Sequence, residues 1–507
     1  MDSKDFIVFR TDATYKMGTG HFMRCLTLAE NLKKRGAQIR FISRDLPAHL
    51  QTMLQTKSIE FVALAKNIND DITGDLAHSH WLGCSQTEDA HATLQALAGK
   101  NWDWLVVDHY ALDARWEKKL RKKVKKILVI DDLADRKHEC DVLLDQNYYA
   151  DMETRYLGKV PTQCQLLLGA GYALLRDEFL QKRAQIKPRS GAIKRILVFF
   201  GGVDADNYTG LAIAALAAIA FSEIQIDVVI GAGHPYREQI KSSCAERGFN
   251  CHIQTDKMAQ LMAEADLAIG AGGSATWERC CLGLPTLAIC TADNQQKQLA
   301  DTALVGWLYS PEIKKEFQQL QTHIAALIEN NYLREFISRN CMQAVDGQGI
   351  LRVISSLENN HIEMRRARLE DSENIFQWRN HARIRAVSNH TGLIAWSEHQ
   401  KWFSSTLSDS KKALLIGWIK ESPVGVVRFD VQNNDAEISI YLVPDGSFAG
   451  QGKNLLKSAE RWFAANFPAV SQINANVLGD NIPSHKLFAA LGYQIDSTCY
   501  KKELKHD

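Results

Sequence analysis

A histidine follows a glycine-containing loop near the start of the chain, in the stretch YKMGTGHFMRCLTLAENLKKRG. Gly18 and Gly20 lack a Cβ atom, so a ligand can approach the backbone closely there. His21 comes next, where an apolar repeat at helical spacing begins and the first backbone N–H groups of a helix are unpaired. The positive end of the helix dipole disfavours an imidazolium, and a neutral imidazole can take a proton from water. The loop therefore predicts a catalytic base at His21, with a histidine bonded to a local carbonyl as the alternative.

The same loop does not fit a dinucleotide site. The fingerprint G-x-G-x-x-G would need a glycine at position 23, where Met23 stands. The following strand also lacks an acidic residue in the usual place, because Arg44 precedes Asp45. The sequence therefore argues against NAD or FAD at this loop.

A second glycine loop occurs in LAIGAGGSATWERCCLGLP, between a short apolar run and an apolar repeat at helical spacing. Gly270, Gly272 and Gly273 allow a backbone path that presents amides to a diphosphate. Ser274 is expected to cap the helix and to contact a phosphate oxygen. Glu278 follows one turn later and could accept the ribose hydroxyls of a nucleotide, or simply face solvent. A plain strand-to-helix turn is the alternative for the whole loop.

The order of expected elements divides the chain into three parts. Strands and helices alternate over residues 1–180 and again over 191–345, which is typical of parallel sheets covered on both faces. Residues 363–507 contain mostly hairpin-linked strands with helices, which predicts an α+β domain. The fold class is therefore α/β, with two Rossmann-like lobes and a ligand cleft between them, followed by the α+β domain. The basic run KKLRKKVKK, residues 118–126, is expected to be the solvated face of a helix.

Composition narrows the function classes. A formal net charge of +1 gives no overall attraction to nucleic acid or anionic membranes, and no apolar stretch is long enough to span a bilayer. The acidic N-terminus argues against a signal peptide, and the 11 cysteines include no C-x-x-C pair, so we expect a reduced, cytoplasmic protein. Backbone amides of the glycine loops are expected to offset the charge of the diphosphate, so no metal is expected.

Four blocks of the first two parts resemble a known family. RTDATYKMGTGHFMRCLTLAENLKKRG, VVDHYALDARWE, ILVIDDLADRKHECDVLLDQN and GAGYALLRDEF are similar to the UDP-sugar hydrolases of pseudaminic acid biosynthesis, over roughly residues 5–345. The resemblance implies a fold like that of GT-B glycosyltransferases, and a catalytic role for His21. It also implies release of UDP from UDP-2,4-diacetamido-2,4,6-trideoxy-β-L-altropyranose.

The resemblance extends to substrate contacts. The pattern E-x-x-x-x-G-L-P followed by ADNQQ is similar to GT-B nucleotide-sugar sites, which implies that Glu278 holds the ribose and that Asn294 and Gln295 reach the sugar or diphosphate. The glycine turn FFGGVD faces the same cleft in such lobes. Residues at strand ends of the first lobe are expected sugar contacts, or else turn and cap residues. The expected substrate set is Gly18, Gly20, Asp12, Asp108, Tyr110, Gly201, Gly202, Gly272, Gly273, Ser274, Glu278, Asn294 and Gln295.

The last part resembles the GNAT acetyltransferases. In YLVPDGSFAGQGKNLLKSAERWF, Gly450 and Gly452 fit the acetyl-CoA pattern [R/Q]-x-x-G-x-[G/A], whereas Ser447 replaces its first residue. NVLGDNIPSHKLFAALGY supplies the second half of the family pattern, including Asn481 and Ser484. The resemblance implies acetyl-CoA as co-substrate, bound by Val443, Phe448, Ala449, Gly450, Gln451, Gly452, Lys453, Asn481 and Ser484.

The acid of the acetyl transfer is not evident from the pattern. Phe488 stands where many GNAT enzymes carry a tyrosine that protonates the leaving thiolate, and a phenyl ring cannot do so. Tyr441, Tyr493, Tyr500 or a water are the candidates. Glu437 could help to remove the amine proton, or could face solvent as an ordinary strand residue.

Both resemblances lead to one metabolite. The expected function is N-acetylation of the 4-amino group of a UDP-4-amino sugar, followed by hydrolysis of the product to UDP and 2,4-diacetamido-2,4,6-trideoxy-L-altrose. The main alternative is a GT-B glycosyltransferase fused to an acetyltransferase, in which His21 activates a sugar hydroxyl. A third hypothesis is a sugar-nucleotide sensor without turnover. The sequence leaves the oligomeric state and channelling between the two sites open.

Overall fold

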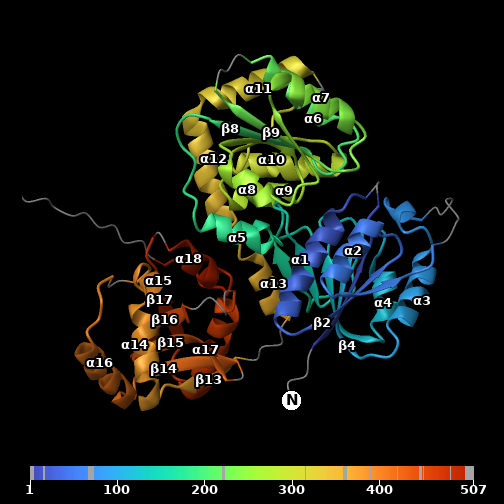
Figure 1. The fold of residues 1–507 in the computed structure, drawn as a ribbon. Coiled ribbons are helices and arrows are strands. Elements are labelled where there is room, and N and C mark those ends of the chain that lie inside the picture. The colour runs from blue at the N-terminus through green and yellow to red at the C-terminus, as the bar shows by residue number, and fades with distance from the viewer. Residues whose placement is uncertain are drawn as a thin grey trace, which may run out of the picture. The chain divides into compact units, whose positions relative to one another are not determined.

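The computed structural model in Figure 1 describes residues 5–14, 17–66, 74–219, 223–313, 316–357, 362–388, 391–419, 421–444, 448, 450–479 and 481–496. The chain divides into two compact units, Met1–Ile354 and Ser355–Asp507. The first unit contains two parallel sheets, and the second contains one mixed sheet. Within the described residues, no helix is both long and apolar enough to cross a membrane.

The first lobe is built on a seven-stranded parallel sheet with the order β3-β2-β1-β4-β5-β6-β7. Its strands are β1 (Phe6–Thr11), β2 (Gln38–Ser43), β3 (Glu60–Ala63), β4 (Trp102–Asp108), β5 (Val124–Ile130), β6 (Val142–Asp145) and β7 (Gln165–Leu168). The central strands are continuous apolar runs because helices cover both faces of the sheet. Thr11 pairs with Asp108, so the carboxyl ends of β1 and β4 meet at one edge.

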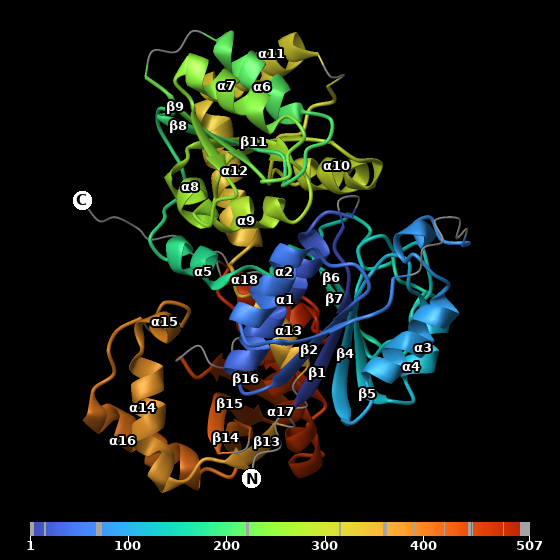
Figure 2. The same ribbon diagram turned by 45° about the vertical axis from the view of Figure 1, so that its right-hand side comes forward.

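Helices cover this sheet on both sides, as Figure 2 shows. They are α1 (Gly20–Lys34), α2 (Ala48–Thr56), α3 (Gln86–Ala96) and α4 (Ala114–Leu120), with the short helix η1 (Ser79–Trp81) before α3; η2 (Ala170–Tyr172) and α5 (Asp177–Arg183) follow the sheet. Phe22 of α1 packs on Phe41 of β2, with ring centroids 5.6 Å apart. On the opposite face, Trp116 of α4 packs with Val8 and Leu105 in one core cluster.

The helix expected after the first glycine loop is present as α1. Phe22, Leu26 and Ala29 recur at helical spacing and are buried, which explains why this segment folds as a helix against the sheet. The helix ends before Gly36, whose φ of +97° is a left-handed conformation that favours glycine.

The basic run at residues 118–126 does not form one helix, so that prediction is wrong. Helix α4 ends at Leu120, and strand β5 begins at Val124. Val124 and Ile127 follow Leu120 at helical spacing, but they are buried in a strand that lies between β4 and β6. The segment from Val124 folds as a strand because the sheet buries these residues against both neighbouring strands and the helices above them.

The second lobe has a five-stranded parallel sheet with the order β10-β9-β8-β11-β12. Its strands are β8 (Arg195–Phe199), β9 (Gln225–Ile230), β10 (Asn250–Ile253), β11 (Leu267–Ala271) and β12 (Thr286–Ile289). Its helices are α6 (Tyr208–Ala217), α7 (Arg237–Arg247), α8 (Met258–Glu264), α9 (Ala275–Cys281), η3 (Asp293–Gln295), α10 (Gln296–Leu304), α11 (Phe317–Glu329) and α12 (Asn331–Ala344), and α13 (Gly349–Leu357) follows the lobe. Strands β8 and β11 are neighbours, so the loops after them emerge at the same edge.

The second unit has a five-stranded sheet with the order β13-β14-β15-β16-β17, antiparallel except between β16 and β17. Its elements are β13 (Glu363–Arg366), η4 (Leu369–Asp371), α14 (Ser372–Asn380), α15 (Ala382–Arg385), α16 (Trp396–Ser408), β14 (Lys412–Ile419), β15 (Ser422–Gln432), β16 (Asp435–Leu442), α17 (Gly452–Asn466), β17 (Gln472–Ala475) and α18 (Ile482–Ala489). Helix α17 buries Leu455, Ala459 and Phe463 against the sheet, and Phe463 stacks on Phe429 at 4.0 Å.

Candidate functional site

His21 begins α1 and faces a carboxylate across the sheet edge. Its Nδ1 lies 2.6 Å from Oδ1 of Asp108, the last residue of β4, and the two residues are 7% and 0% exposed. Because a carboxylate only accepts hydrogen bonds, this contact places a proton on Nδ1, so that in the neutral imidazole Nε2 is the acceptor nitrogen. The histidine is thus held by a carboxylate instead of a local carbonyl, an arrangement that suits a general base.

Arg24 lies one helical turn after His21 and binds the same carboxylate. Its Nε and one terminal nitrogen donate to Oδ2 and Oδ1 of Asp108 at 2.6 and 2.7 Å. Burial acts to raise the pKa of Asp108, but the charge of Arg24 and the hydrogen bonds from Arg24 and His21 together outweigh it and hold that pKa well below its usual range. Asp108 is therefore a fixed negative partner for the imidazole.

Asp108 was expected to contact the sugar, and the structure gives it a different place. Its side chain is fully buried and both its oxygens are occupied by Arg24 and His21. We therefore assign Asp108 to holding the histidine.

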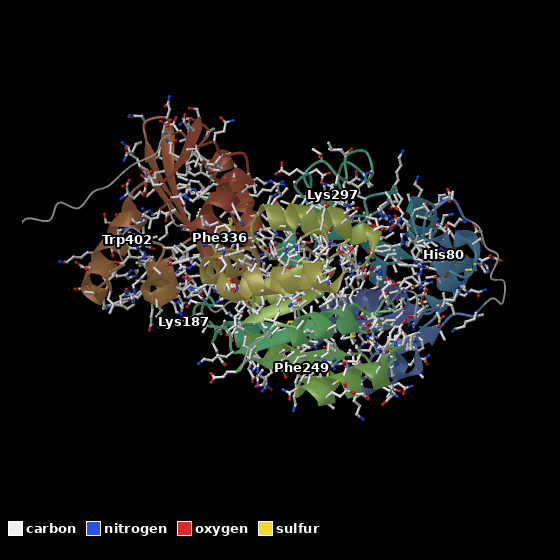
Figure 3. All side chains as sticks on the ribbon, turned by 90° about the horizontal axis from the view of Figure 1, so that it is seen from above. His80, Lys187, Phe249, Lys297, Phe336 and Trp402 are labelled. Carbon is white, nitrogen blue, oxygen red and sulfur yellow. The ribbon has the colours of Figure 1, made fainter. Side chains whose placement is uncertain are left out.

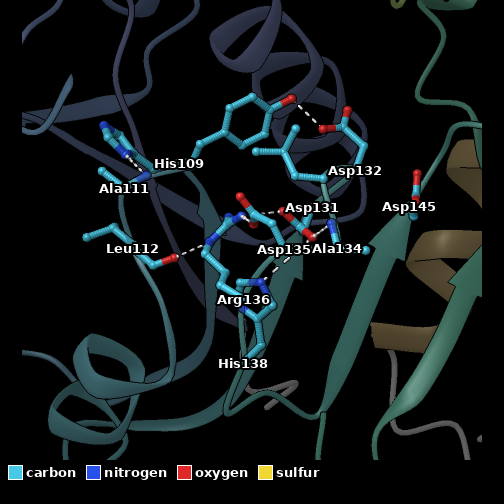
Figure 4. Close-up of polar contacts among 12 residues, drawn as sticks. His109, Ala111, Leu112, Asp131, Asp132, Ala134, Asp135, Arg136, His138 and Asp145 are labelled. Carbon is cyan, nitrogen blue, oxygen red and sulfur yellow. Dashed lines mark hydrogen bonds and ion pairs between the residues drawn. The ribbon is translucent and has the colours of Figure 1, made fainter. Parts of the chain in front are cut away.

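Tyr110 packs against the imidazole ring of His21. Its ring meets the His21 ring edge-on, with centroids 4.5 Å apart, and Trp81 stacks on it at 5.6 Å. The Tyr110 hydroxyl donates to Asp132, which Figure 4 shows next to Asp131. Burial raises the pKa of Tyr110, so the phenol stays neutral. Asp132 also accepts a 3.0 Å bond from Arg24, which joins both contacts into one network.

Asp12 lies in a separate buried network and does not join this one directly. It is 1% exposed, and its Oδ1 accepts from the Arg10 guanidinium and from the Arg44 backbone N–H, each at 2.7 Å. Its Oδ2 lies 3.2 Å from Nε2 of His109. With both oxygens facing protein groups, Asp12 is placed to stabilise the lobe, and a direct sugar contact does not fit its surroundings.

The glycines of the first loop border open space among the described residues. A Cβ atom at Gly18 or at Gly20 would meet no described atom within 4 Å. Gly18 has a φ of +73° and donates its N–H to the Thr14 carbonyl at 2.9 Å, which closes a tight turn before α1. This leaves room for a ligand beside His21.

The second glycine loop follows β11 and leads into α9. Gly273 has a φ of +91°, and a Cβ atom at Gly272 would lie 3.2 Å from Oε1 of Gln295, so these predicted residues are neighbours. Oε1 of Gln295 accepts from the backbone and hydroxyl of Thr291 at 3.2 and 3.1 Å, and Asn294 beside it is exposed. Gly272 and Gln295 therefore lie side by side just beyond the end of β11.

The prediction that Ser274 caps α9 is wrong. Its φ and ψ of −59° and −33° are already helical, so its hydroxyl does not take the capping position, and no capping bond forms. Its side chain is exposed at the helix start. Gly270 allows a close backbone contact, because a Cβ atom there would lie 2.2 Å from the Phe199 carbonyl oxygen.

Glu278 points to a cation. Its carboxylate lies 3.4 Å from the Arg176 guanidinium, and its side chain is 20% exposed. Burial raises the pKa of Glu278, and the charge of Arg176 opposes that effect. Gly201 and Gly202 follow β8, next to β11, and Gly201 has a φ of +98°. The glycine turns after β8 and β11 therefore lie at the same edge of the sheet.

In the second unit, most of the expected acetyl-CoA residues surround the start of α17. Val443 follows β16, Gly450 has a φ of +91°, and Gln451 directly precedes the helix. Gly452 and Lys453 form its first turn, where the N–H groups of a helix have no intrahelical acceptor and can bind a pyrophosphate. The remaining residues are Phe448, in the turn before Gly450, and Ala449, which lies outside the described residues.

Asn481 and Ser484 bind each other at the start of α18. The Asn481 side chain accepts from the Ser484 backbone N–H at 3.2 Å, so Asn481 acts as the helix cap. A Cβ atom at Gly452 would lie 3.7 Å from Leu487 of this helix, which places α18 against the start of α17.

The candidate acids of the acetyl transfer have distinct surroundings. Tyr493 donates to Glu460 at 2.7 Å and meets Phe488 edge-on at 4.9 Å. Burial raises the pKa of both Tyr493 and Tyr441, whereas Tyr500 lies outside the described residues. Glu437 is exposed and accepts from Asn476 at 3.1 Å, as a solvent-facing strand residue would.

Arg24, Asp132, Asn147 and Trp277 belong to the network around His21 but were not predicted. Arg24 carried a signal, since it lies three residues after His21 on the same helix face. Asp132 lies two residues after the end of β5, the strand next to β4, so its carboxylate could also have been found. Among the described residues, no group of three or more His, Cys, Asp or Glu side chains is arranged to hold a metal ion.

Sheet order and sequence matches together define the class of the chain. Residues 195–341 match the glycosyltransferase family 28 C-terminal domain, and residues 361–494 match the GNAT acetyltransferase domain. The glycotransferase of kitacinnamycin has a similar fold, with a TM-score of 0.50 at 13% identity over 70% of this chain and 99% of that one. The chain thus has two Rossmann-like lobes of GT-B type followed by a GNAT-like domain, and the predicted fold class is confirmed.

Two proteins are similar in sequence to this chain over nearly all of their own length. An uncharacterised protein of Methanocaldococcus jannaschii is 24% identical over 96% of both chains. The UDP-2,4-diacetamido-2,4,6-trideoxy-β-L-altropyranose hydrolase of Campylobacter jejuni is 24% identical over 59% of this chain and 97% of its own length. The resemblance predicted for the first two parts is therefore supported at the level of a distant relationship.

Proposed function

We propose that the chain carries out two consecutive reactions on one UDP-sugar. The second unit transfers an acetyl group from acetyl-CoA to the 4-amino group of the UDP-4-amino sugar. The first unit then hydrolyses the UDP-2,4-diacetamido product to UDP and 2,4-diacetamido-2,4,6-trideoxy-L-altrose. The observation that carries the hydrolytic half is the 2.6 Å contact between His21 and Asp108 beside a loop with open space.

In the hydrolysis, Nε2 of His21 accepts a proton from water while the water oxygen attacks the anomeric carbon. The bond between that carbon and the diphosphate oxygen breaks, and UDP leaves with the electron pair. Asp108 keeps the imidazole in the tautomer that can accept a proton, and its charge stabilises the imidazolium that forms. Attack opposite to the leaving group inverts the anomeric configuration.

The leaving diphosphate needs donors, and the second lobe supplies backbone amides. The turns at Gly201–Gly202 and Gly272–Gly273 lie at one sheet edge, and α9 begins directly after the second turn. In this proposal Ser274 offers its exposed hydroxyl to a phosphate oxygen, and Glu278 accepts the ribose hydroxyls. Asn294 and Gln295 reach the sugar or the diphosphate.

In the acetyl transfer, the first turn of α17 binds the pyrophosphate of acetyl-CoA through backbone N–H groups. The sugar amine attacks the thioester carbonyl carbon, the proton of the amine passes to water, and the carbon–sulfur bond breaks, so that coenzyme A leaves as a thiolate that is protonated to the thiol. Tyr441, Tyr493, Tyr500 or a water supplies that proton, because Phe488 cannot.

The choice of substrate is supported by the resemblance and by the match to the Campylobacter hydrolase. This match covers nearly all of that protein's length. The GNAT match supports an acyl-CoA co-substrate for residues 361–494. Acetylation of the amine produces the substrate of the hydrolysis, which gives the fusion of the two units a chemical reason.

Incubation of the purified chain with the UDP-4-amino sugar, with and without acetyl-CoA, tests the proposal. We expect UDP, followed by chromatography, to appear only when acetyl-CoA is present. A glycosyltransferase would release UDP only when an acceptor sugar is added, and a sensor would bind both ligands without turnover. Either result would contradict the proposal.

A further inference from the structure

A five-residue segment, residues 147–151, begins two positions after the end of β6 and contacts the second lobe of the first unit. Residues 147–151 each contact the second lobe. Their partners are, in order, Trp277, Trp307, Lys297, Asp301 and again Lys297. Asn147 bonds to the side-chain carboxylate of Asp132, which belongs to the network around His21, whereas Tyr149 donates to the backbone carbonyl of Asp132.

The orientation of the Asn147 amide is determined by its two partners. Its Nδ2 donates to Oδ2 of Asp132 at 3.2 Å, and its Oδ1 accepts from the indole N–H of Trp277 at 2.9 Å. A carboxylate can only accept and an indole N–H can only donate, so a flipped amide would lose both bonds. Its backbone N–H donates to Asp145 at 3.0 Å, which fixes the main chain as well.

The contacts continue without a break from Asp132 to the catalytic histidine. Arg24 donates to Oδ2 of Asp132 at 3.0 Å and to both oxygens of Asp108, and Asp108 holds His21. At the other end, Trp277 is fully buried in α9, the helix that carries Glu278 and starts at the second glycine loop. One chain of side chains therefore joins the imidazole to the helix proposed to hold the nucleotide.

We propose that Asn147 is a positioning residue for the hydrolysis, which sets the distance between His21 and helix α9. This inference rests on the proposed function. The nucleotide would be held by the second lobe and the attacking water by the first, so the rate depends on how accurately the two lobes are placed. A misplacement of about 1 Å can lower a rate by about 100-fold. The contacts proposed for UDP do not involve Asn147, so nucleotide affinity should not depend on it.

The test uses the full chain and the UDP-diacetamido sugar. Asn147→Ala removes both side-chain bonds, and Trp277→Phe removes only the indole donor. Lys297→Met is the matched control, because Lys297 bonds to Asp151 and Asp301 at the same seam but not to the network around His21. Lys297 lies on α10, and Figure 3 labels it. Each rate is divided by the concentration of UDP-binding sites, which calorimetric titration measures, so that misfolded protein is not included.

We expect kcat to fall at least about tenfold in Asn147→Ala and in Trp277→Phe, with KM and the Kd of UDP changed less than about twofold. The double variant should be no slower than the slower single variant, because both changes break the same bond. Lys297→Met should keep the wild-type kcat.

Wild-type kcat in Asn147→Ala, fully multiplicative losses in the double variant, or an equal loss in Lys297→Met would overturn the positioning role. Those outcomes leave the proposed function standing. A wild-type chain that releases no UDP from the sugar nucleotide would instead overturn the hydrolysis, and this inference with it.

Discussion

Arg24 donates to both carboxylate oxygens of Asp108, at 2.6 and 2.7 Å, while the same carboxylate holds His21. A buried carboxylate beside a lone imidazole would be costly, and the guanidinium offsets its charge. The arginine also reaches Asp132, so one cation serves two carboxylates. Helical spacing makes this possible, because Arg24 and His21 lie on the same face of α1.

Asp108→Asn tests the role of the carboxylate. The amide can donate to Nδ1 of His21 and so favours the tautomer whose Nε2 cannot accept a proton. We expect kcat for UDP release to fall by about 100-fold to 10,000-fold, with little change in KM. Steady-state kinetics with the UDP-diacetamido sugar measure this. A variant with wild-type kcat would show that the carboxylate does not set the tautomer.

Glu278→Gln tests the ribose contact. A hydrogen bond to a charged group contributes about 1.5–3 kcal/mol, so its loss should raise the Kd of UDP by roughly tenfold or more. Isothermal titration of the full chain with UDP measures this directly. Glu264→Gln, in α8, is a matched control on the same lobe, and its Kd should equal that of the wild type. Unchanged UDP affinity in Glu278→Gln would remove Glu278 from the nucleotide site.

The sequence predicted the elements and the edge of each sheet better than it predicted side-chain roles. Apolar periodicity located α1 and the strands, because burial on both faces of a parallel sheet leaves a clear pattern. The same cue failed at residues 118–126, where apolar residues spaced three or four apart belong to a helix end and a strand. Only tertiary burial separates these two cases.

Partners that are distant in sequence could not be inferred from local patterns. Asp108 is 87 positions from His21, and nothing in its neighbourhood distinguishes a sugar ligand from a carboxylate that holds a histidine. Asn147 and Trp277 are 130 positions apart. By contrast, the glycine turns could be predicted, because their backbone conformation depends on local sequence alone.

His138 predicts a pH dependence of stability. It lies 2.8 Å from Glu117 and, as Figure 4 shows, beside Asp131 and Arg136. Burial acts to lower the pKa of His138, but the Glu117 carboxylate and the nearby Asp131 carboxylate outweigh it and raise that pKa to about 9. The unfolded value is about 6.5. Because the folded pKa is the higher one, the stabilisation is complete below about pH 6.5 and is lost as the pH rises toward 9.

Denaturant unfolding between pH 6 and 9.5 measures this effect. The wild-type free energy of unfolding should fall by about 3 kcal/mol more than that of His138→Gln over this window. Parallel curves for the two proteins would contradict the assigned charge on His138.

Gly450→Ala tests whether the two units act independently. Gly450 has a φ of +91°, which is strained for any residue with a Cβ atom. The substitution should therefore distort the loop before α17 and raise KM for acetyl-CoA by about tenfold or more. Hydrolysis of the UDP-diacetamido sugar, supplied directly, should keep its wild-type rate. Loss of both activities would show that the two units do not act independently.

The most direct measurement follows UDP and the sugar nucleotides by chromatography when His21→Ala is given the UDP-4-amino sugar and acetyl-CoA. We predict that the variant acetylates the amine at the wild-type rate and accumulates the UDP-diacetamido sugar, with almost no free UDP. Release of UDP at the wild-type rate by this variant would contradict the assignment of His21 as the base of the hydrolysis.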